Sequence, residues 1–125
     1  MQIIKTITEC NTWRDQAHGS IGIVPTMGAF HRGHLSLVTR SLKVCDVTVV
    51  TLFVNPAQFA PHEDFDLYPK TATQDLNYLK GKKVDAVFMP SVDEMCQTSK
   101  RDYFFKTDLA YKLEGKSGPS FFKGV

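Results

Sequence analysis

Nine consecutive residues, Asp46-Val-Thr-Val-Val-Thr-Leu-Phe-Val54, constrain the fold more than any other part of this 125-residue chain. The run is too continuously apolar for a strand that keeps one face in water. Asn55 and Pro56 follow it directly and end it. We therefore predict that Asp46–Val54 is an interior strand of a parallel sheet that is covered on both faces.

Two more apolar runs, each followed by a proline, predict strands that would pair with the first. Ile21–Val24 predicts a buried strand that ends at Pro25, and Val84–Met89 predicts a third strand that ends at Pro90. A fourth run, Tyr103–Thr107, is aromatic and suits an edge strand or a hairpin.

Segments with helical spacing separate these strands. Four residues at that spacing predict a helix over residues 33–44: Leu35, Val38, Leu42 and Cys45. Leu76 and Leu79 predict a second amphipathic helix that ends at Gly81, and Thr8–Trp13 fits a short capped helix. Alternation of strands and helices is typical of a doubly wound α/β domain, in which right-handed crossovers bring the carboxyl ends of the strands to one edge.

Composition excludes several classes of protein. The chain is 42% hydrophobic and 22% charged, and its net charge of +2 provides no broad basic surface, so no nucleic-acid partner is expected. No apolar run reaches the ~18–20 residues that cross a membrane. An odd number of cysteines without a Cys-x-x-Cys pair predicts neither a disulfide framework nor a zinc site: Cys10, Cys45 and Cys96. A reduced, cytoplasmic location is expected.

The segment Pro25–His34 follows a predicted strand and opens a predicted helix. Gly28 permits a tight turn, and Gly33 removes a side chain where a flat ring would lie against the backbone. His31 and His34 are three residues apart at the helix start, so both imidazoles can point the same way. Free N–H groups at a helix N-terminus favour phosphate, and two histidines there can stabilise charge that develops on an attacked phosphate. The competing interpretation is a helix cap and a surface residue, or part of a metal site.

A second polar cluster follows the Asp46–Val54 run. Asn55 and Gln58 offer both donors and acceptors, which suits a hydroxy acid or a carboxylate. Alternatively, Gln58 is a solvated turn residue in a loop bounded by prolines. Ligands of open parallel sheets bind beyond the carboxyl ends of the strands, where both clusters are expected to lie.

The segment Pro25–Leu37 resembles the His-x-Gly-His segment of the pantothenate synthetase (pantoate–β-alanine ligase) family. His-x-Gly-His also marks the wider nucleotidylyltransferase superfamily, so it is specific for nucleotidyl transfer rather than for one substrate. Further segments that match the family in order narrow the resemblance: Phe53–Phe59, Glu63–Phe65, Tyr68–Thr71, Asp75–Leu76, Val84–Asp85, Met89–Val92 and Leu113–Gly115.

The resemblance implies a Rossmann-like N-terminal domain, a homodimer, and a reaction in which ATP, with Mg²⁺, converts pantoate to pantoyl adenylate. β-Alanine then attacks the adenylate to give pantothenate and AMP. His34, the proton donor, and His31 are the implied catalytic residues, Gln58 and Asn55 would bind pantoate or β-alanine, and no side chain is expected to ligate a metal. Eight consecutive residues would lie along ATP: Met27, Gly28, Ala29, Phe30, His31, Arg32, Gly33 and His34.

The same resemblance predicts that residues 1–125 form an ATP- and pantoate-binding domain that is incomplete at its C-terminus and inactive by itself. Gly118, Ser120 and Phe121 stand where the family pattern has arginine, glycine and histidine. Two other functions stay open: a non-catalytic nucleotide-binding fragment, and another His-x-Gly-His nucleotidylyltransferase.

Overall fold

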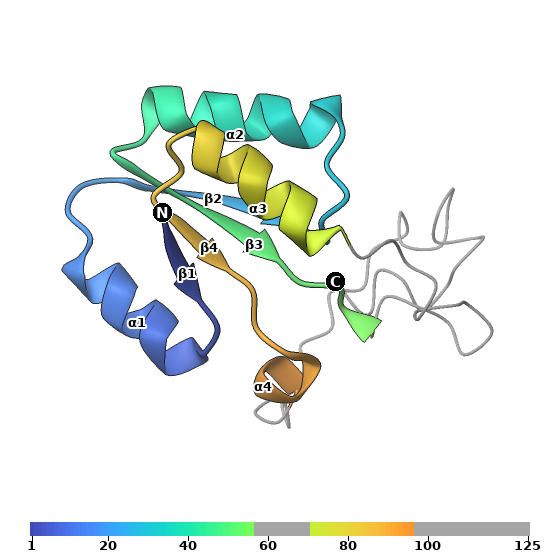
Figure 1. The fold of residues 1–125 in the computed structure, drawn as a ribbon. Helices are drawn as coiled ribbons and strands as arrows, with labels where there is room; N and C mark the ends of the chain where they lie inside the picture. The colour runs from blue at the N-terminus through green and yellow to red at the C-terminus, as the bar shows by residue number, and fades with distance from the viewer. Residues whose placement is uncertain (57–70, 97–125) are drawn as a thin grey trace, which may run out of the picture.

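The computed structural model describes residues 1–56 and 71–96, which contain a four-stranded, fully parallel sheet (Figure 1). The spatial order of the strands is β1-β4-β3-β2. Their bounds are Gln2–Ile4 for β1, Ile21–Thr26 for β2, Val47–Leu52 for β3 and Ala86–Phe88 for β4. The predicted interior position of the Asp46–Val54 run is confirmed, because β3 lies between β4 and β2.

Helices cover both faces of the sheet, as a doubly wound α/β fold requires. Helices α2 (Arg32–Val44) and α3 (Ala72–Gly81) lie on one face, and α1 (Ile7–Gln16) lies on the other (Figure 1). A short helix, α4 (Val92–Cys96), follows β4. None of the helices in the described ranges has the length and apolar character that crossing a membrane needs.

The core is divided between these two faces. Beneath α2 and α3, one cluster joins buried side chains of three strands and both helices: Val24, Val38, Val50, Leu52, Leu79, Val84 and Val87. On the opposite face, Ile4, Val49 and Ala86 pack against Cys10 and Trp13 of α1. The alternation of inward side chains along β3 therefore fills both layers, which explains why its sequence is apolar throughout.

Strand β2 differs from its prediction in length and in burial. It continues through Pro25 to Thr26, and Ile23 is 64% exposed. The Ser20 carbonyl accepts from the Val47 N–H at 3.0 Å, and the Thr26 carbonyl accepts from the Phe53 N–H at 3.1 Å. Backbone groups of alternate residues in a strand point to opposite sides, so those of Pro25 point away from β3. Proline lacks an N–H and is tolerated on this side of β2, which forms no ladder bond within the described residues. The prediction that the strand stops at Pro25 is therefore wrong.

Three other boundaries move by a few residues. The first helix begins at Ile7 with Thr6 as its cap, in a capping box with Glu9, and the helix predicted over residues 33–44 begins at Arg32. The strand predicted over Val84–Met89 is shortened to Ala86–Phe88. The predicted strand Tyr103–Thr107 lies outside the described residues.

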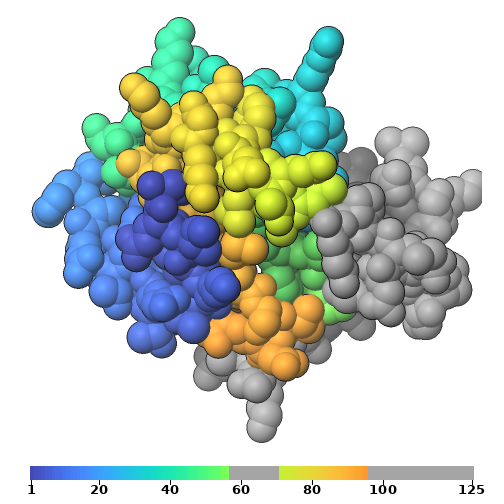
Figure 2. All heavy atoms as spheres, in the orientation of Figure 1, coloured from blue at the N-terminus to red at the C-terminus, as the bar shows by residue number. Residues whose placement is uncertain are grey.

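Strand β1 is absent from the predictions, because three residues carry too little pattern to identify a strand. It forms by parallel pairing with β4, in which Ile3 lies opposite Val87. The N-terminal segment and the end of the described chain consequently lie side by side (Figure 2), and the Ile7 N–H donates to the Glu94 carboxylate at 2.8 Å.

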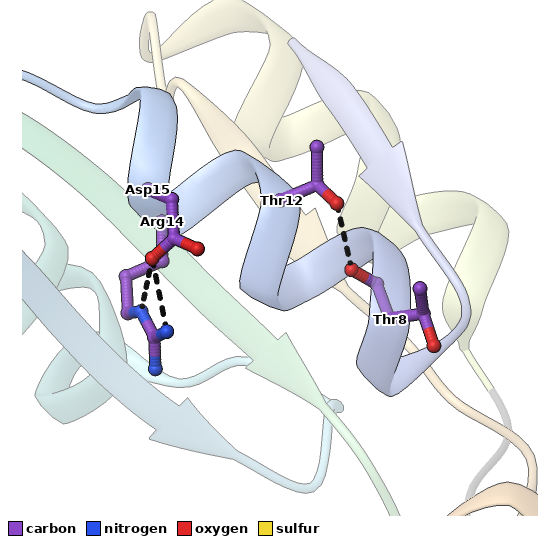
Figure 3. A network of polar contacts seen from close by, with 4 residues as sticks. All are labelled: Thr8, Thr12, Arg14 and Asp15. Atoms are coloured by element: carbon purple, nitrogen blue, oxygen red, sulfur yellow. Dashed lines mark hydrogen bonds and ion pairs between the residues drawn. The ribbon is translucent and has the colours of Figure 1, made fainter.

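The other polar contacts of α1 shown here are local. The Thr12 hydroxyl donates to the Thr8 carbonyl at 3.1 Å, and the Arg14 guanidinium pairs with its neighbour Asp15 (Figure 3). The Arg14 and Asp15 side chains are 60% and 68% exposed, and exposed pairs of this kind contribute ~0–1 kcal/mol. These exposed contacts therefore stabilise the helix only modestly.

Candidate active site

The segment that joins β2 to α2 forms a tight turn beyond the carboxyl end of the sheet. The Thr26 hydroxyl donates to the Thr51 carbonyl at 2.7 Å and accepts from the Gly28 N–H at 3.2 Å. Gly28 (φ +85°) and Ala29 (φ +52°) both adopt left-handed backbone. A Cβ at Gly28 would lie 2.9 Å from Oδ2 of Asp75, so conformation and space both require glycine there.

His31 and His34 are brought together at the start of α2, as their spacing predicts. Their rings are stacked, with centroids 4.0 Å apart. Nδ1 of His31 accepts from the Gly33 N–H at 3.0 Å, and Nδ1 of His34 accepts from the His31 N–H at 3.4 Å. A ring nitrogen that accepts carries no proton, so these contacts assign the proton of each neutral imidazole to Nε2. The pair can therefore offer two Nε2–H donors to one ligand.

The expectation of free backbone donors at this helix start is only partly correct. The N–H groups of His31 and Gly33 already bond to imidazole nitrogens. The imidazoles cap the helix, and His34 also lines a cavity, so a capping role and a ligand-binding role are not exclusive. Gly33 does lie against a flat ring, which is the imidazole of His31 itself: a Cβ at Gly33 would be 2.8 Å from its Cε1.

Electrostatics favour the neutral form of His34. Desolvation lowers the pKa of His34, the neighbouring His31 lowers it further, and the Asp75 carboxylate partly opposes both. A neutral imidazole donates through Nε2–H while its Nδ1 remains an acceptor. This state suits hydrogen bonding to phosphate oxygens at neutral pH.

A cavity of about 320 Å³ joins the two predicted clusters. His34 and Asn55 line it together with residues from the ends of β2 and β3: Pro25, Thr26, Met27, Thr51 and Phe53. Ligand cavities begin at ~300 Å³, so a small hydroxy acid is of suitable size. Gln58, predicted to face the same space, lies outside the described residues.

A second cavity, of about 340 Å³, lies across the ends of β3 and β4. Met27 and Phe53 line both cavities, and Met89 and Pro90 line only the second. Its lining is largely apolar, and the Asp75 side chain is its charged member. The carboxyl edge of the sheet thus carries a cavity of mixed polarity beside His34 and a largely apolar cavity next to it.

Asp75 is the site residue that sequence reasoning missed. It is 5% exposed on α3, and its carboxylate accepts from the N–H groups of Ala29 and Phe30 at 2.9 and 3.3 Å. The sequence did contain a signal for this residue. Asp75 lies four positions before Leu79, so it falls on the apolar side of the predicted amphipathic helix although it is charged. Burial of a carboxylate is costly unless donors surround it, which marks such a position as structural or functional.

Comparisons with known proteins agree on one family. The family model described as "Pantoate-beta-alanine ligase" matches residues 2–125. The chain is 44% identical to pantothenate synthetase of Roseiflexus castenholzii and 42% identical to pantoate–beta-alanine ligase of Saccharomyces cerevisiae; each alignment covers all of this chain and 45% of the relative. The chain therefore spans about 45% of the length of these relatives.

Solved structures show the same similarity. Pantothenate synthetase from Thermus thermophilus superposes with a TM-score of 0.91 at 36% identity, over 100% of this chain and 45% of that one. Pantoate–beta-alanine ligase from Francisella tularensis, complexed with beta-gamma ATP and beta-alanine, superposes with a TM-score of 0.92 at 37% identity, over 99% of this chain and 49% of that one. The α/β fold with a parallel sheet is thus common to this chain and these structures.

Proposed function

The chain belongs to the pantoate–beta-alanine ligase family, and from that premise we propose that the protein which carries it makes pantothenate from pantoate, β-alanine and ATP. In the first step, a carboxylate oxygen of pantoate attacks the α-phosphorus, the bond to the β-phosphate breaks, and pyrophosphate leaves. In the second step, the amine of β-alanine attacks the acyl carbon, the bond to AMP breaks, and the amine loses a proton.

The observation that carries this proposal is the stacked pair of imidazoles beside a cavity that also contains Asn55. The two Nε2–H groups can donate hydrogen bonds to the α-phosphate oxygens as negative charge accumulates on those oxygens. His34 lines the cavity and would be the closer donor. Stabilisation of this kind is worth ~10²–10³ in rate for each donor. Asn55, and Gln58 beyond the described residues, are proposed to hold the hydroxyl and carboxylate groups of pantoate or β-alanine.

We propose that the segment Met27–His34 lies along bound ATP. Residues 1–125 would then form the domain that binds ATP and pantoate. Within residues 1–56 and 71–96, no group of three His, Cys, Asp or Glu side chains gathers to hold a metal ion. Mg²⁺ does not need such a group, because at nucleotide sites it is usually bound by one or two carboxylates together with the phosphates. We propose that Mg²⁺ enters on the triphosphate, as it commonly does in nucleotide sites. A cytoplasmic homodimer is the proposed working form.

An assay of two half-reactions tests the proposal on the full natural polypeptide. Pyrophosphate release should require both ATP and pantoate, and pantothenate should appear by mass spectrometry only after β-alanine is added. α-Alanine is the matched control and should give no corresponding product. Pyrophosphate release without pantothenate would instead indicate another nucleotidylyltransferase, and ATP binding without either product would indicate a nucleotide-binding protein.

A further inference from the structure

We propose that Asp75 is a positioning residue that holds the turn Gly28–Phe30 and, through it, the stacked imidazoles of His31 and His34. The inference rests on the proposed function for its catalytic consequence, but its structural claim can be measured independently. It concerns a residue of α3 that lies 46 positions along the chain from Ala29, which it contacts.

Within residues 1–56 and 71–96, the hydrogen bonds of the Asp75 carboxylate are with the turn and with Thr71. Oδ2 accepts from the Ala29 N–H at 2.9 Å and from the Thr71 hydroxyl at 2.9 Å. Oδ1 accepts from the Phe30 N–H at 3.3 Å. The Ala29 N–H is also 3.1 Å from the Thr71 hydroxyl, so Thr71 supports the same arrangement. Consecutive N–H groups that point at one anion form a nest, and here the anion is a side chain of the protein.

The backbone of the turn needs such support. Gly28 and Ala29 are both left-handed, and alanine adopts this conformation at a conformational cost because its Cβ approaches the following carbonyl oxygen. An acceptor that bonds to two successive N–H groups stabilises this one conformation over the extended alternatives. Asp75 is 5% exposed, so water competes little for these bonds.

The turn leads directly into the histidine pair. Phe30 precedes His31, and its ring lies 5.8 Å from the His34 ring and 6.4 Å from the Tyr78 ring of α3. The Phe30 side chain is therefore held between the helix that carries Asp75 and the imidazole that faces the cavity. A shift of the Phe30 backbone would move both imidazoles relative to Asn55.

Three donors among the described residues bond to the Asp75 carboxylate, and all three belong to the turn or to Thr71. The same bonds occupy the N–H groups of Ala29 and Phe30, which leaves phosphate binding to the imidazoles rather than to this nest. Asp75 therefore acts through the turn and is not itself a catalytic residue.

The test compares Asp75→Asn with Asn77→Ala in the full natural protein. Asn77 is an exposed residue of the same helix and serves as the matched control. An asparagine offers one oxygen in place of two, so one of the two backbone N–H groups loses its acceptor. Amide hydrogen exchange at Ala29 and Phe30, together with imidazole chemical shifts of His31 and His34, reports the geometry without reference to any reaction.

We expect faster exchange at Ala29 or Phe30 and altered imidazole shifts in Asp75→Asn, with both unchanged in Asn77→Ala. The kcat for pyrophosphate release should fall about 10²-fold while KM for pantoate stays near the wild-type value, because misplaced groups lose rate rather than ground-state binding. Thr71→Val removes the supporting hydroxyl and should give the same pattern more weakly, and it decides the question if Asp75→Asn does not fold.

Unchanged exchange and unchanged imidazole shifts in a folded Asp75→Asn protein would overturn the inference, whatever its activity. Altered geometry with a wild-type kcat would also overturn it, because the turn would then not position the reacting groups. If the wild-type protein releases no pyrophosphate, the proposed function fails by itself, and the exchange data still decide whether Asp75 holds the turn.

Discussion

Substitution of Gly33 by alanine should separate the activity of this protein from its stability. A Cβ at Gly33 would lie 2.8 Å from Cε1 and 3.0 Å from Nδ1 of the His31 imidazole, closer than such atoms normally approach. The backbone of Gly33 is not left-handed, so alanine is tolerated there and the imidazole must rotate away. Rotation breaks the 3.0 Å bond from the Gly33 N–H to His31 and the 4.0 Å stack on His34.

Two opposing terms set the change in stability. Loss of a helix cap costs ~1 kcal/mol, whereas alanine in place of glycine within a helix gains up to ~1 kcal/mol. The free energy of unfolding should therefore change by less than ~1 kcal/mol. Loss of one positioned donor lowers the rate of charge-forming steps by ~10²–10³. Urea unfolding and pyrophosphate release, measured on the same preparation, check the two quantities.

Gly81→Ala is the matched control for this experiment. Gly81 ends α3, no atom of the part of the chain that the structure describes lies within 4 Å of the position its Cβ would take, and its backbone is not left-handed. Alanine there should raise stability by ~0.4–1 kcal/mol and leave the rate unchanged. A wild-type rate in Gly33→Ala, with the His31 imidazole shifts altered, would refute the claim that the stacked arrangement serves the reaction.

Other substitutions test the site and the core separately. His34→Ala should lower adenylate formation by ~10²–10³ and lower stability by no more than the ~1 kcal/mol of a lost cap, and near-normal pyrophosphate release by the folded variant would contradict its role. The pKa of His34 is lowered on folding, so the folded protein resists protonation of this imidazole more than the unfolded chain does. Its contribution to stability is therefore complete above the ordinary histidine pKa of ~6.5 and is lost as the pH falls from there through the lowered pKa of the folded state. Urea unfolding at each pH should show wild type losing stability relative to His34→Ala over that pH range. Leu79→Ala, at a fully buried position, should cost ~2–5 kcal/mol in urea unfolding, and a cost under ~1 kcal/mol would show that the core beneath α3 is loosely packed. Thr6→Ala should cost ~1 kcal/mol by loss of the capping box, with no change in rate.

Local pattern was sufficient for the central part of the fold. The continuous apolar run around β3 identified an interior parallel strand, and the spacing of Val38 and Leu42 identified α2 to within one residue at its start. These features are encoded over a few neighbouring residues, because side-chain period follows directly from backbone geometry. For the same reason the sequence placed His31 and His34 together, because residues three positions apart are neighbours on one side of a helix.

Tertiary structure decided what depends on which segments become neighbours. The three residues of β1 are a strand only because β4 pairs with them, and β2 passes through Pro25 only because that side of the strand bonds to no partner in the described sheet. The bond from Ala29 to Asp75 joins residues 46 positions apart, and no local period reports such a contact. The histidines and Asn55 could therefore be proposed as candidates from the sequence, whereas the geometry of the turn and the carboxylate that holds it follow from how α3 packs against that turn.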